Sequence, residues 1–301
     1  MTRCDLVRLL FRPLLCFAIC LPPYAEAAIT VQDDTGRMVR LEKPAERIVS
    51  LAPNTTELLF AAGAGGRIVG TVDYSDYPQA ARKIPRIGSF EQIDVERLIA
   101  LKPDLVVLWA DGGMERQLGT VRRLGIPVFY SSAHKLADIP DSIERLGRLT
   151  ATVPQAEQAA AGLREKLAEM RTRYRDRPPV TVFYQVWSKP LYTLNGTHIL
   201  SDVLHLCGGR NVFAGLTAAA PVVSIESVLL ADPEAMIAGA EPGHIGGLDM
   251  WKRYPQLRAV RQGNLFEMNS DLLSRAGPRL FDGAAAVCER LDQARQRRVG
   301  R

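Results

Sequence analysis

Two glutamates occupy matching places in two similar segments of the chain, and their type and spacing suit recognition of a cationic partner. Asp94 and Ser224 can each cap a helix, and Glu96 and Glu226 follow two positions later, at a constant offset of 130 residues. A carboxylate in the first turn of a helix complements the helix dipole, which contributes up to about 1 kcal/mol. A matched pair could instead dock two arginines of a two-fold symmetric partner, because arginine–carboxylate contacts fix orientation as well as affinity. Both interpretations stay open for Glu96 and Glu226.

The sequence contains no recognisable catalytic constellation. Its histidines, His134, His198, His205 and His244, lie neither in an HExxH pattern nor near a GxSxG elbow. His205 falls on the apolar face of an expected helix, where we predict a packed core residue. Distant cysteines and few histidines lack the ligand spacing of a metal site. An exported α/β enzyme would need a base or nucleophile with a poised partner. We therefore predict a protein that is not an enzyme and has neither a metal site nor a cofactor of its own.

Aromatic side chains gather next to expected strands rather than along helix faces. They are Tyr74, Phe90, Trp109, Trp187 and Tyr192. Aromatics at strand ends beside a cleft suit a flat, mostly apolar ligand. The alternative is that the same rings pack in the core.

The elements that must position these residues follow an α/β pattern, because short apolar runs alternate with helical patterns. We predict strands at 47–51, 105–109, 128–131 and 181–187, and helices after Asp94 and at 114–124. Asn54, followed by Glu57, predicts a capped helix start. Residues 153–177 are rich in helix formers, which predicts a long, partly exposed helix that joins two lobes.

The two halves of the chain resemble each other. Besides the glutamate segments, residues 65–69 (GGRIV) echo residues 208–212 (GGRNV). These matches favour a duplicated lobe. We expect an N-terminal lobe at 28–152, the linker helix at 153–177, a C-terminal lobe at 178–296 and a tail at 297–301. Two lobes that flank one helix leave a cleft between them, and small molecules bind in such clefts.

The N-terminus is typical of a cleaved signal peptide spanning residues 1–27. Arginines precede a short apolar run at 14–21, and Ala25 and Ala27 supply small residues at the cut. The run is far shorter than the roughly 20 apolar residues that span a bilayer. A lipid anchor on Cys20 is the alternative, which the bulky Ile19 disfavours. We therefore predict an exported, periplasmic protein.

Cleavage changes the charge and the cysteine count. Basic residues fall from 38 to 35 and acidic residues from 33 to 31, and the remaining charges are interleaved, so no nucleic-acid partner is expected. Cys207 and Cys288 remain in an oxidising compartment. A bond between them would close a loop of about 80 residues, worth roughly 4 kcal/mol, while two unrelated buried thiols are the alternative.

Four segments, at 47–62, 74–78, 94–109 and 207–213, resemble the periplasmic cobalamin-binding proteins of ABC importers. The similarity extends in order over almost all of residues 45–292. It implies two Rossmann-like lobes with central parallel sheets, joined by one long rigid helix, with a ligand cleft between the lobes. It also implies a monomer that captures cobalamin or a related corrinoid and delivers it to an importer permease dimer with its ATPase subunits.

The resemblance also assigns roles to individual residues. It implies that the ligand site includes Ala52, Pro53, Asn54, Tyr74, Phe90, Trp109, Tyr192, Asp271 and Arg275. It places Glu96 and Glu226 on the two docking glutamates, and Cys207 and Cys288 on the family's disulfide. Phe90 and Ala220 stand where the family has tryptophans that contact the ligand. Haem or a ferric siderophore is the alternative ligand, because their binders share the fold.

Overall fold

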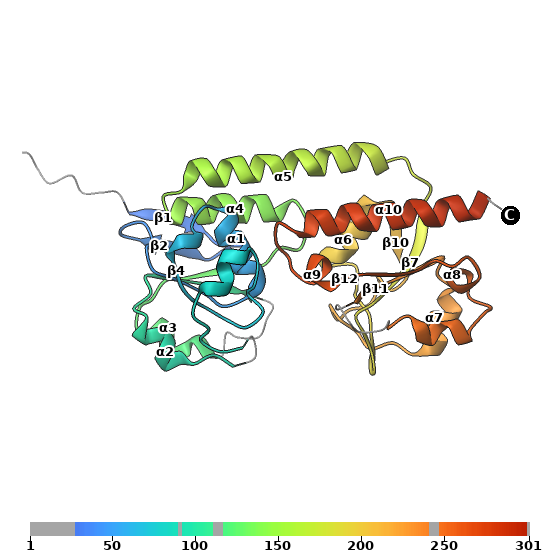
Figure 1. The fold of residues 1–301 in the computed structure, drawn as a ribbon, viewed down its shortest axis with the longest axis horizontal. Coiled ribbons are helices and arrows are strands. Elements are labelled where there is room, and N and C mark those ends of the chain that lie inside the picture. Colours follow the sequence, from blue (N-terminus) through green and yellow to red (C-terminus); the bar gives the residue numbers. More distant parts are fainter. Residues whose placement is uncertain (1–27, 90–91, 111–116, 241–246, 300–301) are drawn as a thin grey trace, which may run out of the picture.

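The computed structural model describes residues 28–89, 92–110, 117–240 and 247–299. It forms two α/β lobes, and helix α5 (Val153–Tyr174) runs along both of them (Figure 1). Each lobe contains a four-stranded parallel sheet. The predicted fold class is confirmed.

The N-terminal lobe begins with an antiparallel hairpin and continues as an alternating series. Its elements are β1 (Ile29–Gln32), β2 (Met38–Leu41), β3 (Ile48–Ser50), α1 (Pro53–Ala61), β4 (Ile68–Thr71), α2 (Val95–Ala100), β5 (Leu105–Trp109), α3 (Gly119–Arg123), β6 (Val128–Ser131) and α4 (Asp138–Leu149). The predicted strands at 105–109 and 128–131 agree with β5 and β6 residue for residue.

The C-terminal lobe repeats the series with a small hairpin after its first strand. Its elements are β7 (Val180–Gln185), β8 (Trp187–Ser188), β9 (Leu191–Tyr192), α6 (Ile199–Leu206), β10 (Gly209–Asn211), α7 (Ile225–Ala231), β11 (Ala235–Ala240), α8 (Arg258–Arg261), β12 (Leu265–Asn269), α9 (Ser270–Leu273) and α10 (Leu280–Val299). Residues 297–299, which were expected in a tail, belong to α10.

The two sheets share one topology, as a duplicated lobe requires. Their strand orders are β4-β3-β5-β6 and β10-β7-β11-β12. In each sheet, the strand that comes first in the chain therefore occupies the second position in space. The repeated acid after the proline also makes the same bond in both lobes. Asp104 accepts a hydrogen bond from the backbone N–H of Arg47 (2.9 Å), and Glu234 accepts one from that of Thr181 (3.1 Å). These equivalent contacts support the duplication that the sequence indicated.

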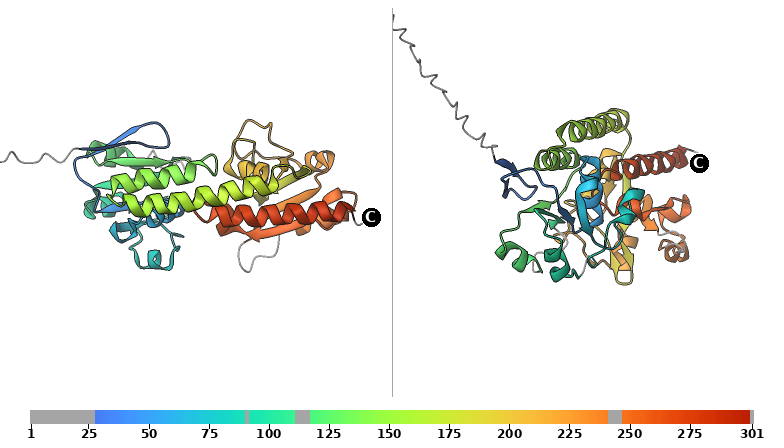
Figure 2. Two further views of the ribbon diagram at one scale, coloured as in Figure 1. Left: turned by 90° about the horizontal axis from the view of Figure 1, so that it is seen from above. Right: turned by 60° about the vertical axis from the view of Figure 1, so that its left-hand side comes forward.

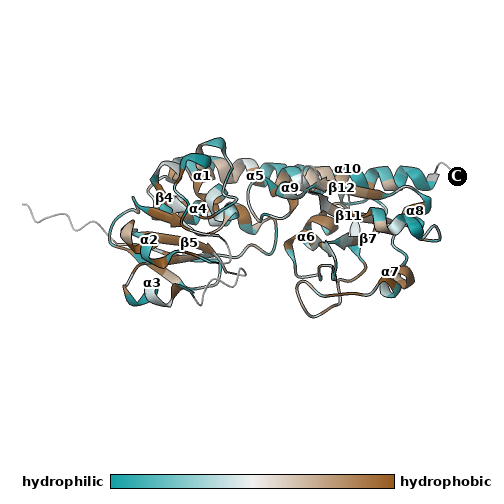
Figure 3. Cartoon of the chain, turned by 60° about the horizontal axis from the view of Figure 1, so that its bottom comes forward, coloured by the Kyte–Doolittle hydropathy of each residue, from teal (hydrophilic) through white to brown (hydrophobic). Residues whose placement is uncertain are grey.

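Helices cover both faces of each sheet. In the N-terminal lobe, Leu105 and Val107 of β5 face the core beneath α1 and α4, whereas Val106 and Leu108 face the core beneath α2 and α3. This alternation is the two-residue period of a strand. The C-terminal sheet is covered in the same way by α6 and α10 on one face and by α7 and α8 on the other. Figure 3 accordingly shows the central strands mainly in brown and α10 mainly in teal.

A single hydrophobic core connects the lobes. It runs from Leu58 of α1 through Leu163 and Leu167 of α5 to Leu200 of α6 and Leu291 of α10. Figure 2 shows α4, α5 and α10 side by side on this face of the molecule. The buried side chains of α5 pack in a core that includes residues of both lobes. The helix is therefore packed along its length and is not a free linker.

Two local predictions are wrong. Asn54 does not cap α1: the N-cap is Ala52, no side chain caps it, and the helix starts at Pro53, whose fixed φ suits the first helical position. His205 is exposed on α6 rather than packed in the core. In contrast, Asp94 and Ser224 do cap α2 and α7, by accepting hydrogen bonds from the backbone N–H groups of Arg97 and Ser227.

Candidate functional site

The residues predicted to bind the ligand follow the carboxyl ends of parallel strands in both lobes. Ala52, Pro53 and Asn54 follow β3, and Trp109 ends β5. Between these two strands the chain order of the sheet reverses, and ligands of open α/β sheets bind outside such switch points. Pro53 begins α1, and Asn54 lies within it and is buried.

Tyr74 is the most exposed aromatic residue among those that the structure describes in the N-terminal lobe. It follows β4, its side chain is 77% exposed, and its φ of 62° lies in the left-handed region that non-glycine residues seldom adopt. The structure thus holds Tyr74 in an uncommon conformation that leaves its ring in solvent, three residues after the sheet ends. Phe90 lies outside the described residues.

The C-terminal lobe presents an aromatic hairpin after β7. Trp187 of β8 lies opposite Tyr192 of β9, and the Trp187 indole donates a hydrogen bond to the carbonyl of Lys189 (3.0 Å). Tyr192 in turn bridges to Val222. Trp187 is 64% exposed, although a tryptophan is usually buried. The sequence grouped Trp187 with the strand-end aromatics that suit a flat ligand, although the family resemblance did not place it among the ligand residues. The structure places it at the C-terminal counterpart of the switch point.

A cluster of charged side chains joins the two lobes at these strand ends. Arg275, after α9, donates hydrogen bonds to Glu57 of α1 (3.3 Å), to Asp76 in the segment after β4 (3.0 Å) and to Asp271 (2.8 Å). Arg279 binds Glu57 in a bidentate manner: its Nε donates to Oε2 (3.1 Å) and its Nη2 donates to Oε1 (2.6 Å). Segments that follow β4 and β12 therefore meet across the lobe boundary, next to α1.

Within this inter-lobe cluster, the surroundings of Asp76 favour its ionised form. Burial raises the pKa of the Asp76 carboxyl, but its hydrogen bond and charge interaction with Arg275 outweigh burial and hold that pKa below the usual range. Arg279 also lies over the ring of Tyr77, 4.1 Å from its centre. The sequence indicated only a helix-capping role for Glu57 and no role for Arg279. The available signals were a charged residue inside an apolar helix face and two arginines four positions apart.

Glu96 and Glu226 lie exposed in the first turns of α2 and α7. Both helices lie on the side of the molecule opposite α5 (Figure 1). The backbone N–H of Glu226 and then the Ser224 hydroxyl lower the pKa of Glu226, so its carboxylate is ionised at neutral pH. Glu96 also borders an open hollow of about 530 Å³.

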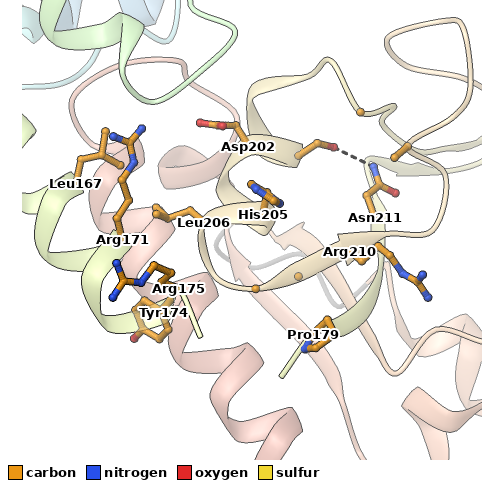
Figure 4. A pocket seen from close by; sticks show the side chains of 15 residues that line it. Leu167, Arg171, Tyr174, Arg175, Pro179, Asp202, His205, Leu206, Arg210 and Asn211 are labelled. Carbon is orange, nitrogen blue, oxygen red and sulfur yellow. Dashed lines mark hydrogen bonds between the residues drawn. The ribbon is translucent and has the colours of Figure 1, made fainter. Parts of the chain in front are cut away.

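A larger open cavity, of about 870 Å³, lies elsewhere, between the C-terminal part of α5 and the α6–β10 region (Figure 4). Leu167, Arg171, Tyr174 and His205 are among its lining residues, and none of the predicted ligand residues lines it. Its size alone does not make it the ligand site, because the strand-end aromatics are elsewhere.

The C-terminal lobe also contains a disulfide. The bond joins Cys207 at the end of α6 to Cys288 of α10, and both residues are buried. The described part of the chain holds no group of three or more His, Cys, Asp or Glu side chains that could bind a metal ion. Within the same residues, no helix is long and apolar enough to cross a membrane.

Known proteins resemble this chain along most of its length. A family model described as periplasmic binding protein matches residues 48–272. The vitamin B12-binding protein of Vibrio parahaemolyticus is 35% identical over 257 residues, which cover 85% of this chain and 93% of that protein. That of Vibrio cholerae is 37% identical over 254 residues, which cover 84% and 91%.

Solved structures agree. The crystal structure of the periplasmic vitamin B12 binding protein of Vibrio cholerae matches with a TM-score of 0.77 at 37% identity, over 84% of this chain and 98% of that chain. A periplasmic heme binding protein from Pseudomonas aeruginosa matches with a TM-score of 0.69 at 26% identity, over 81% and 91%. The family expected from the sequence is confirmed: this chain belongs to the periplasmic binding proteins.

Proposed function

We propose that this protein captures cobalamin or a related corrinoid in the cleft between its lobes and delivers it to the permease of an ABC importer. The observation that carries the proposal is where the exposed aromatic side chains lie. Among the described residues these are Tyr74, Tyr77 and Trp187, which follow β4 and β7. Flat apolar rings follow strands in both lobes, and Arg275 connects the lobes through Asp76 in the segment after β4, an arrangement that suits a large planar ligand.

The proposed ligand contacts are Ala52, Pro53, Asn54, Tyr74, Phe90, Trp109, Tyr192, Asp271 and Arg275, to which we add Trp187. The relatives named for vitamin B12 support a corrinoid. Haem is the second candidate, because a heme binding protein shares the fold at 26% identity. Binding without turnover is proposed, since the aromatic residues offer contact area and the arginines offer orientation.

Calorimetry and visible spectra of the purified mature protein test the ligand. Cyanocobalamin should bind with one molecule per monomer, whereas haem and a ferric siderophore should bind far more weakly. If haem or the siderophore binds and cyanocobalamin does not, the corrinoid assignment is wrong while the family stands.

Glu96 and Glu226 are proposed to dock the loaded protein on a two-fold symmetric permease dimer. Both residues are exposed, and their helices, α2 and α7, lie on the same side of the molecule, one per lobe. A partner that presents the same arginine twice requires such an arrangement. The double variant Glu96→Gln, Glu226→Gln should keep its ligand affinity and stability but lose delivery in a reconstituted uptake assay. Normal uptake by that variant would mean that both residues only complement helix dipoles.

Export to the periplasm as a monomer, after cleavage of residues 1–27, completes the proposal. The relatives' family supports this location. Mass spectrometry of the protein from the periplasmic fraction should give an N-terminus near residue 28.

A further inference from the structure

Glu57 is a buried carboxylate that connects the lobes through two arginines. It lies in α1 and is 2% exposed, and its partners Arg275 and Arg279 come from the chain more than 200 residues later. Arg279 is anchored to both oxygens of Glu57, and Arg275 shares one of them. The N-terminal lobe therefore determines where these C-terminal side chains lie.

Arg275 keeps hydrogen-bonding capacity after these contacts are made. Its guanidinium has five N–H groups. Two on Nη1 point to Glu57 and Asp76, and one on Nη2 points to Asp271. Among the described residues, no acceptor contacts the second N–H of Nη2 or the N–H of Nε, so both are open to a ligand. The side chain is one-tenth exposed.

We infer that Glu57 is a positioning residue for ligand binding: from the N-terminal lobe, it holds the guanidinium of Arg275 in the orientation in which the remaining N–H groups meet polar substituents of the corrinoid. This rests on the proposed function. Arginine recognises acceptors with a rigid planar fork, so its orientation determines whether those N–H groups reach the ligand.

The geometry explains why Glu57 matters more than the other two carboxylates. Asp76 and Asp271 are both about two-fifths exposed and pull Arg275 toward solvent from opposite lobes, whereas Glu57 holds it from the buried side. Without the charge of Glu57, Arg279 also loses the carboxylate that it contacts with two hydrogen bonds, and the segment that carries both arginines is no longer fixed against α1.

The test is calorimetric titration of the full mature protein with cyanocobalamin. Glu57→Gln should weaken binding about tenfold, which is the effect of one misplaced charge-assisted hydrogen bond. In an Arg275→Ala background the same change should cause no further loss, because there is no guanidinium left to position. Asp76→Asn, at a more exposed carboxylate, should show a smaller loss with the same dependence on Arg275, and it remains informative if Glu57→Gln does not fold.

Asp34→Asn is the matched control. Asp34 is also a nearly buried carboxylate paired with an arginine, Arg145, but it lies in the β1–β2 turn of the N-terminal lobe. The Asp34→Asn change should leave cobalamin affinity unchanged. Unchanged affinity in Glu57→Gln, or an equal loss with and without Arg275, would overturn the inference and leave the proposed function intact. No cobalamin binding by the unmodified protein would overturn both.

Discussion

Trp187 offers the sharpest test of the proposed ligand contacts, because its ring is already exposed and its loss should not unfold the protein. A tryptophan can bury about 250 Å². With 64% of the side chain exposed, about 160 Å² remains for a ligand to cover. At about 25 cal/mol per Å², full coverage would contribute about 4 kcal/mol, and contact with one face of the ring about half of that. Trp187→Ala should therefore weaken cobalamin binding by about 2 kcal/mol, or about 30-fold.

Titration calorimetry measures this loss, and thermal unfolding checks that the fold is intact. Trp187→Phe should recover most of the affinity, because it restores a flat ring. Met38→Ala is the control, since Met38 is equally exposed, at 64%, but lies on β2, away from the strand-end aromatics. A Trp187→Ala protein that binds within about threefold of wild type would refute the stacking assignment.

Removing the disulfide with Cys207→Ala and Cys288→Ala should lower the free energy of unfolding by about 2–5 kcal/mol in a urea titration, because the bond closes a long loop in the unfolded chain. Cobalamin affinity should not change, and two free thiols in unreduced, denatured wild-type protein would show that the bond does not form. Acid should also destabilise the fold. Burial raises the pKa values of Asp76 and Glu234, but arginine hydrogen bonds outweigh it and lower both. Each carboxylate thus stabilises the fold above its ordinary pKa, 3.8 or 4.5, and this contribution is lost as the pH falls through the lowered values. Asp34 opposes this trend, because burial raises its pKa. A melting temperature that stays constant from pH 6 to pH 3 would show that the contribution of Asp34 cancels those of Asp76 and Glu234.

The parts of the fold that the sequence could predict are those determined by local residues. The strand at 105–109 is bounded by Pro103 and Asp104, and the helix caps at Asp94 and Ser224 depend on side chains that reach only three positions along the chain. The prediction for Asn54 was wrong because Pro53 suits the first helical position, so the helix starts two residues earlier than a cap at Asn54 would place it.

The inter-lobe cluster could not be predicted in this way. Glu57 and Arg275 are 218 residues apart in sequence, and no local pattern relates them. Glu57 even satisfied a local rule, the capping box, and so received a wrong role. Trp187 shows the converse: its residue type indicated a site, but only the hairpin with Tyr192 revealed that its ring is exposed.

The continuous core limits how the protein can respond to its ligand. Leu163, Leu167 and Met170 of α5 are buried in the same cluster as Leu58 of one lobe and Leu291 of the other. A large hinge motion would expose these side chains to water, at roughly 1.5–3 kcal/mol for each one fully exposed. It would also break the buried contacts of Glu57. We therefore expect a largely preformed cleft, in which ligand binding moves the backbone by less than about 1 Å. The same rigidity would hold Glu96 and Glu226 at a fixed separation, so that one symmetric partner could contact both. Small-angle X-ray scattering with and without cyanocobalamin should give nearly the same radius of gyration. A clear decrease on binding would show that the lobes close as hinged bodies, and that the shared core does not hold them in place.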